Sequence, residues 1–127
     1  MRNNLIAIGL ALALIGANFI FSRNESNAEP PSIDNVKMEN GVQIVELKAK
    51  GGYLPRRSLA TAGLPTIIRF DTNGTFDCSS AVRIPSLNLS KNLVASGTTD
   101  LDVGTPQVGV LKGTCSMGMY PFEVNFK

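Results

Sequence analysis

The side chains of this sequence that could carry metal or redox chemistry are those that contain sulfur. The chain has 2 cysteines, Cys78 and Cys115, and the second opens a Cys-x-Met-x-Met run that includes Met117 and Met119. Side chains two residues apart in an extended segment point the same way, so the three sulfur atoms of this run are predicted to share one face, with Gly118 allowing a bend. Thiolates and thioethers are soft ligands that favour Cu(I) over calcium, magnesium or manganese. The pattern therefore predicts a copper site, Cu(I) rather than Cu(II), in which these four sulfur-containing residues are the candidate metal ligands.

A disulfide between the same two cysteines is the second interpretation. In an exported domain an even number of cysteines is most often paired. A bond between Cys78 and Cys115 would close a long loop and stabilise a small domain by roughly 4 kcal/mol. Met117 and Met119 would then be core-packing side chains near the last strand, and no metal would be bound. Because oxidation would switch off metal binding, the two states could exist at different times, and both interpretations stay open.

Several classes of function are excluded by composition. The chain has no histidine, which removes Ser-His-Asp and Cys-His catalysis, histidine zinc sites and the His₂Cys centre of blue copper proteins. No convincing acid–base pair is present, and Asp71 and Asp77 are predicted to serve local backbone hydrogen bonds. The basic residues are scattered, with Arg56-Arg57 as the only adjacent pair, which is read as a solvated edge. The sequence therefore predicts neither an enzyme nor a nucleic-acid-binding protein.

The N-terminal segment has the composition of an export signal. Arg2 precedes an uncharged, largely apolar run from Leu5 to Phe21, close to the lower limit of about 17 residues for a membrane-spanning helix. Small residues around Ala28 would also suit cleavage of a signal peptide. Residues 1–22 are therefore predicted to be a signal anchor, forming an N-terminal hydrophobic helix, or a signal peptide. An anchor would hold the domain on the extracytoplasmic face of the cytoplasmic membrane, whereas cleavage after Ala28 would make it secreted or periplasmic.

The remaining sequence divides into a linker and one domain. Residues 23–40 contain Pro30-Pro31, several Asn and Ser and no apolar periodicity, and are predicted to be a flexible linker. Residues 41–127 contain about seven or eight short strand-like segments separated by Gly and Pro signals, without an amphipathic helix. Alternation is clearest in Val42–Ala49 and Phe122–Phe126. This pattern predicts an all-β fold, either an antiparallel sandwich or a barrel.

Four ordered landmarks between Gly51 and Lys127 resemble a known family. They are Gly52-Tyr53-Leu54-Pro55, Cys78-Ser79-Ser80-Ala81-Val82-Arg83-Ile84-Pro85, Leu93 before Gly97, and Cys115-Ser116-Met117-Gly118-Met119. The set resembles the cupredoxin-like domains of bacterial metal-handling proteins, including those associated with copper-transporting P-type ATPases and iron-uptake lipoproteins.

The resemblance implies an antiparallel Greek-key β-sandwich. It also implies that the mid-chain loop and the loop before the last strand meet at one end, which would bring Cys78 close to Cys115, Met117 and Met119. The histidines that many members use are missing, and Tyr120-Pro121 replaces the glycine usually found after the methionines. A blue electron-transfer centre is therefore not expected.

Together these observations predict an exported, membrane-tethered, non-enzymatic protein that binds or relays copper as Cu(I). A copper transporter or a cuproenzyme would be its partner, and the membrane would be contacted through the N-terminal helix. The alternative is a disulfide-locked β-sandwich that acts as a structural or protein-interaction module without metal.

Overall fold

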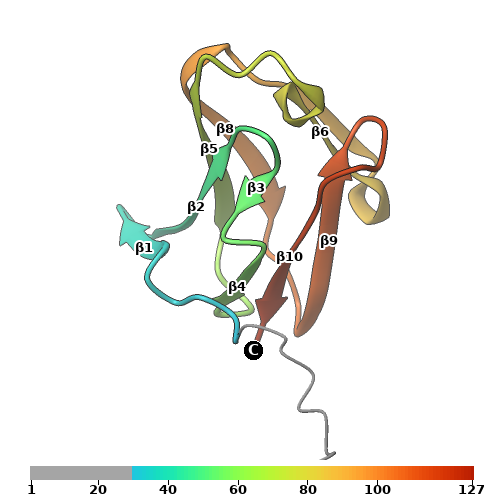
Figure 1. The fold of residues 1–127 in the computed structure, drawn as a ribbon. Coiled ribbons are helices and arrows are strands. Elements are labelled where there is room, and N and C mark those ends of the chain that lie inside the picture. The colour runs from blue at the N-terminus through green and yellow to red at the C-terminus, as the bar shows by residue number, and fades with distance from the viewer. Residues whose placement is uncertain (1–29) are drawn as a thin grey trace, which may run out of the picture.

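The computed structural model describes residues 30–127, which form two β-sheets packed face to face (Figure 1). The strands are β1 (Val36–Glu39), β2 (Val42–Ala49), β3 (Tyr53–Leu54), β4 (Arg57–Ala60), β5 (Thr66–Asn73), β6 (Ala81–Ile84), β7 (Leu89–Asn92), β8 (Ser96–Gly104), β9 (Gly109–Cys115) and β10 (Pro121–Phe126). Two short 3₁₀ helices, η1 (Cys78–Ser80) and η2 (Pro85–Leu87), flank β6. The predicted all-β character is confirmed for these residues.

Each sheet has five strands. The first sheet has the order β1-β2-β5-β8, with β3 paired to β2, and the second has the order β4-β10-β9-β6-β7. Burial alternates along β5 and β10, so that one side of each sheet faces the shared core and the other side is more exposed. The bounds predicted for β2 agree with the structure, and the predicted segment Phe122–Phe126 forms β10, which begins one residue earlier, at Pro121.

Two strand pairs correct the prediction of an antiparallel sandwich. β2 pairs with β5 in parallel, and β4 pairs with β10 in parallel, whereas the other pairs in the described residues are antiparallel. Parallel neighbours need a crossover connection. Between β2 and β5 the chain crosses to the second sheet, forms β4 and returns, so β5 enters the first sheet in the same direction as β2. Alternation within a strand contains no signal for the direction of its partner, which is why the sequence pattern did not reveal this.

The domain also begins earlier than predicted. Part of the expected linker over residues 23–40 forms β1, which pairs antiparallel with β2 through Val36–Glu39. Ahead of β1, Ser32 bridges to Ser58 on β4, and the Asn35 amide donates to the Ser58 hydroxyl at 2.8 Å. These contacts cover backbone groups that would otherwise lie open at the edges of both sheets. Residues 32–40 therefore belong to the domain and not to a linker.

The predicted signal anchor or signal peptide over residues 1–22 lies outside the described residues, as does the first part of the predicted linker. Among residues 30–127, no helix is both long enough and apolar enough to cross a membrane.

The centre of the core is an aromatic cluster that joins the two sheets. Tyr53 packs edge-to-face against Phe70 of the first sheet and Phe122 of the second, with ring centroids 5.8 and 5.0 Å away. Phe70 and Phe122 also contact each other at 5.8 Å. The Phe122 ring occupies the space beside Gly113, its partner across the β9–β10 pair, where a β-carbon would overlap the ring. The absence of a side chain at Gly113 therefore leaves room for the Phe122 ring to lie over β9.

We expect Gly113→Ala to destabilise the domain by roughly 1–3 kcal/mol, because the added methyl group overpacks a filled core. The measurement is urea unfolding at neutral pH. Val110→Ala, at an exposed position of the same strand, is the control and should change the free energy of unfolding by much less. Equal stability of Gly113→Ala and the wild type would show that Phe122 can move away without cost.

Candidate metal centre

The two cysteines come from distant parts of the chain and meet at one end of the sandwich. Cys78 is the first residue of η1, and Cys115 is the last residue of β9. Their α-carbons are 5.7 Å apart and their sulfur atoms form a disulfide across a sequence separation of 37 residues. The predicted convergence of these two residues is therefore confirmed, and the disulfide is the state that the structure contains.

Strand pairing next to the disulfide aligns the two segments. Val82 of β6 lies opposite Cys115 of β9, and the backbone N–H of Ser116 donates to the carbonyl of Ala81 at 3.0 Å. Cys78 lies only three residues before Ala81, so the register of β6 against β9 brings η1 to the end of β9. The position of Cys78 thus depends on a backbone ladder and not only on the covalent bond.

Asp77 holds the short helix that carries Cys78. One of its carboxylate oxygens accepts hydrogen bonds from the backbone N–H of Ser79, at 2.7 Å, and from the Ser79 hydroxyl, while the other accepts from the backbone N–H of Gly51 at 2.8 Å. This is the arrangement of a helix N-cap, with an additional link to the turn before β3. The prediction that Asp77 serves local backbone groups is confirmed.

Tyr53 supports the same segment from the core side. Its hydroxyl donates to the carbonyl of Ser79 at 3.1 Å, and the ring is almost completely buried. Burial, with a smaller contribution from the negative charge of Asp77, raises the pKa of the Tyr53 phenol, so it remains a neutral donor at physiological pH. The region around Cys78 is therefore anchored from the core and from a neighbouring turn.

The turn after Cys115 differs from the extended segment that the sequence predicted. The backbone N–H of Gly118 donates to the carbonyl of Cys115 at 2.9 Å, which closes a tight turn, and Gly118 has a φ of 75°. The N–H of Cys115 donates to the carbonyl of Tyr120 at 3.2 Å, which links β9 to the chain leading into β10. Since the run turns instead of continuing as a strand, alternation does not place its three sulfur atoms on one face.

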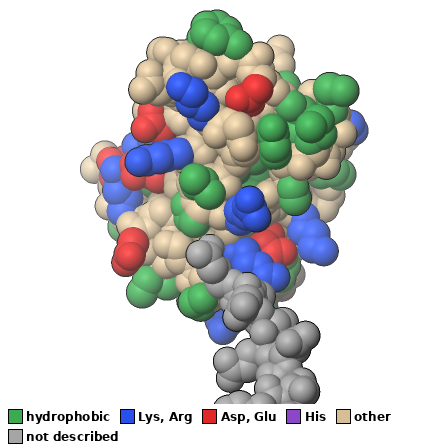
Figure 2. All heavy atoms as spheres, in the orientation of Figure 1, with side chains coloured by type: hydrophobic (Ala, Val, Ile, Leu, Met, Phe, Trp, Pro, Cys, Tyr) green, Lys and Arg blue, Asp and Glu red, His purple; other side chains and the backbone are tan. Residues whose placement is uncertain are grey.

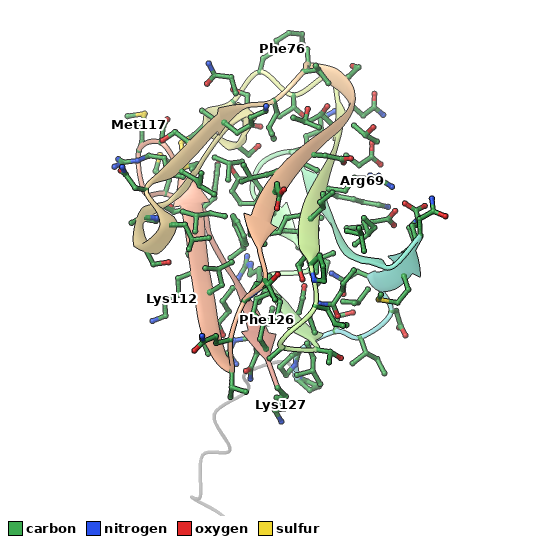
Figure 3. All side chains as sticks on the ribbon, turned by 180° about the vertical axis from the view of Figure 1, so that it is seen from behind. Arg69, Phe76, Lys112, Met117, Phe126 and Lys127 are labelled. Carbon is green, nitrogen blue, oxygen red and sulfur yellow. A yellow bond between two sulfur atoms is a disulfide. The ribbon has the colours of Figure 1, made fainter. Side chains whose placement is uncertain are left out.

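The cysteine and the methionines of this run have opposite environments. Cys115 is completely buried, whereas Met117 is 77% exposed and Met119 62% exposed. Figure 3 shows Met117 at the end of the molecule opposite Lys127, pointing outward from the β9–β10 turn. The structure therefore places a buried Cys115, bonded to a partly buried Cys78, next to a turn that presents two thioethers to solvent.

Other metal-binding chemistry has little support among residues 30–127. They contain no cluster of three or more His, Cys, Asp or Glu side chains that could hold a metal ion. Two of the carboxylates on the first sheet are engaged by Arg69, which lies 2.8 Å from Asp100 and 3.1 Å from Glu39. Besides the Asp77 carboxylate, which caps η1, the candidate donors described at the disulfide end are the sulfur atoms of Cys78, Cys115, Met117 and Met119.

An exposed aromatic side chain close to Cys78 in the sequence, Phe76, was not singled out by sequence reasoning. This ring is 84% exposed and lies two positions before Cys78 in the loop after β5. Figure 3 places it, like Met117, at the end of the sandwich away from Lys127. Period-2 alternation cannot identify such a residue, because it lies in a loop between a strand and a 3₁₀ helix.

Comparison with known proteins gives structural matches only. No protein-family model matches the chain, and no curated protein sequence matches it. The fold is similar to the metal-binding domain of the Cu(I)-exporting P-type ATPase CopA of Streptococcus pneumoniae D39, solved with Cu(I), with a TM-score of 0.67 and 18% identity over 77% of this chain and 98% of that one. It is also similar to a copper-binding protein solved in the apo form by NMR, with a TM-score of 0.68 and 21% identity over 76% of this chain and 98% of that one. At these identities the matches establish a shared fold.

The anchoring role of Asp77 can be tested by removing its carboxylate. Asp77→Ala should lower the free energy of unfolding at neutral pH by about 1 kcal/mol, as expected for the loss of an N-cap. Hydrogen bonds from Ser79 and Gly51, aided by the charge of Lys50, lower the pKa of Asp77. The ionised Asp77 carboxylate therefore contributes its full share to the free energy of unfolding above the ordinary pKa of an aspartate. This contribution is lost as the pH falls through the lowered pKa of the folded state.

The measurement is urea unfolding of the oxidised protein between pH 7 and pH 2, in which the difference between wild type and Asp77→Ala should shrink with acidification. Asp71→Ala, which removes an exposed carboxylate from β5, is the control. A difference between wild type and Asp77→Ala that does not change with pH would show that the charge of Asp77 contributes nothing.

Proposed function

We propose that this protein is a cupredoxin-like, Greek-key β-sandwich that binds and relays Cu(I) through Cys78, Cys115 and the methionines of the β9–β10 turn. The observation that carries the proposal is the meeting of two distant cysteines, with α-carbons 5.7 Å apart, beside a turn with two exposed thioethers. The copper named for both structural neighbours supports the choice of metal. The protein is proposed to be non-enzymatic and exported, and to be tethered to the membrane by its N-terminal segment.

The residues present fit Cu(I) better than other metals. Soft thiolate and thioether donors select Cu(I), and the absence of histidine leaves no imidazole for a Cu(II) centre. Copper binding requires the disulfide to take up two electrons and two protons from a thiol reductant, which produces two thiols. The thiols then lose their protons as they become ligands. The reduced protein is thus the copper-binding form. In the reverse exchange, the disulfide form of the same reductant accepts two electrons, the Cys78–Cys115 bond forms again and the metal is released.

The different environments of the sulfur atoms suggest a division of roles. Cys115 is inaccessible to solvent, so a thiolate there is shielded and gains from pairing with a cation. Met117 and Met119 are exposed, which suits capture of Cu(I) from a partner or its transfer onward. A copper transporter or a cuproenzyme is the proposed partner, because such proteins would deliver or receive the ion.

The proposal predicts that the reduced chain competes with a chromogenic Cu(I) chelator and that Cys115→Ser loses affinity by more than roughly 100-fold, exceeding the usual effect of losing an outer-shell partner. Met117→Leu and Met119→Leu should each weaken binding, since leucine keeps the volume but removes the sulfur. Met38→Leu is the matched control, because Met38 is also exposed, at 53%, but lies on β1 of the first sheet. Equal copper retention by wild type and Cys115→Ser, or retention by neither, would defeat the proposal.

A second candidate function follows from the disulfide itself. In this alternative the Cys78–Cys115 bond is permanent and the domain is a structural or protein-interaction module without metal. The exposed Phe76 and Met117 would then contribute to contact with a partner protein.

The two functions differ in how readily the disulfide opens. If the copper proposal is correct, protein purified without reductant should gain the mass of two hydrogen atoms after mild thiol treatment and should then take up Cu(I). The measurement is intact-protein mass spectrometry under native and denaturing conditions. A quantitative disulfide that persists in the folded protein with mild reductant and copper present would favour the structural module.

A further inference from the structure

The two sheets carry opposite charge. The strands of the second sheet contain four basic residues and one acidic residue, a net charge of +3, whereas those of the first contain three basic and five acidic residues, a net charge of −2. The basic residues of the second sheet are Arg57, Arg83, Lys91 and Lys112, and its acidic residue is Glu123. The formal charge of +2 for the whole chain conceals this separation.

Strand register gathers three of these cations on one outward face. Arg57, Glu123 and Lys112 lie directly opposite one another across β4, β10 and β9. Arg83 of β6 lies opposite Thr114, two residues along from Lys112 and therefore on the same side of the sheet. Figure 2 shows Lys and Arg side chains gathered over the region where Figure 1 labels β9 and β10. The basic residues of the second sheet are therefore close together on one surface, and not only more numerous than its acidic residues.

A shallow hollow of about 290 Å³ lies on this face. Its lining includes the side chains of Arg56, Arg57, Lys112, Pro121 and Glu123. Glu123 is engaged by Arg57 at 2.8 Å, whereas the ion pairs among residues 30–127 include neither Arg56 nor Lys112. The volume lies just below the ~300–1,000 Å³ of typical small-molecule pockets, so the hollow suits a small anionic group.

The described part of the chain begins beside this face. The backbone N–H of Ser32 donates to the carbonyl of Arg57 at 3.0 Å, and Ser32 bridges to Ser58 on β4. Residues 22–31, which connect Ser32 to the apolar run ending at Phe21, can span at most ~35 Å when fully extended. An anchor in the apolar run would therefore keep the cationic face near the membrane surface.

We propose that the outer face of the second sheet docks on an anionic phospholipid surface, with headgroup phosphates held by Arg56, Arg57, Arg83 and Lys112. This inference rests on the membrane tether of the proposed function and adds an orientation to it. Attraction between basic side chains and anionic headgroups is additive over the cations near the surface. The first sheet, with its negative charge, then faces away from the membrane, and the disulfide end of the sandwich stays accessible at the side.

The test uses the full chain in lipid nanodiscs that contain nitroxide-labelled lipids. Amide NMR signals of β4, β9 and β10 should broaden in discs with phosphatidylglycerol but not in discs of phosphatidylcholine alone, and high salt should reverse the effect. Arg56→Ser with Lys112→Ser should lower the ratio of docked to undocked domain roughly 30-fold. Lys48→Ser with Lys50→Ser is the control, because it removes the same charge from β2 and the turn after it.

Equal broadening in both kinds of disc, broadening centred on β2 and β5, or equal loss in the two double variants would each overturn the docking. Signals of the second sheet that stay sharp in anionic discs but shift with a soluble acidic peptide would overturn it in favour of a protein partner. Flotation of the chain with vesicles after a carbonate wash tests the tether separately, and the Cu(I) titration tests metal binding. If the chain floats with vesicles but the NMR signals of the second sheet broaden no more than those of the first, the docking alone is overturned. If the chain does not float, the tether and the docking are both overturned.

Discussion

The short ladder between β6 and β9 is the interaction on which the candidate site depends. It places Val82 opposite Cys115 and aligns Ser116 with Ala81, so the 3₁₀ helix just before β6 reaches the end of β9. Without this register, two cysteines separated by 37 residues would have no reason to meet. The core contact between Tyr53 and Phe122 supports the same end of the sandwich, because Tyr53 also bonds the η1 backbone. Backbone pairing, aromatic packing and the Asp77 cap of η1 therefore together position Cys78 beside Cys115.

The site combines a rigid buried part with an exposed part. Backbone hydrogen bonds hold the segments that carry Cys78 and Cys115, whereas Met117 and Met119 are exposed in the turn that follows. In the proposed copper site, the thiolates of the buried Cys115 and the partly buried Cys78 would hold a soft cation, and the exposed thioethers would give it a route in and out. The same burial explains why oxidation to the disulfide is compatible with the fold, since a disulfide is neutral and leaves no buried charge.

Three features of the surface occupy different parts of the molecule. The sulfur site lies at one end of the sandwich, the cationic hollow lies on the outer face of the second sheet, and the acidic residues gather on the first sheet. The chain enters beside Arg57, next to the cationic face and not next to the methionines. The proposed membrane docking and the proposed metal exchange would therefore use different surfaces of the domain.

Composition and local pattern determined the all-β fold class and the candidate metal donors. The absence of histidine left only sulfur as a soft donor, and alternation with Gly and Pro punctuation predicted strands such as Val42–Ala49 with the correct bounds. Tertiary structure alone decided that β1 replaces part of the predicted linker, that β2 and β5 run in parallel, and that the run after Cys115 closes into a turn. It also separated the charges of the two sheets. The reason is that burial and turn signals act over a few residues, whereas strand partners, their direction and the faces they form depend on contacts between segments that are far apart in the chain.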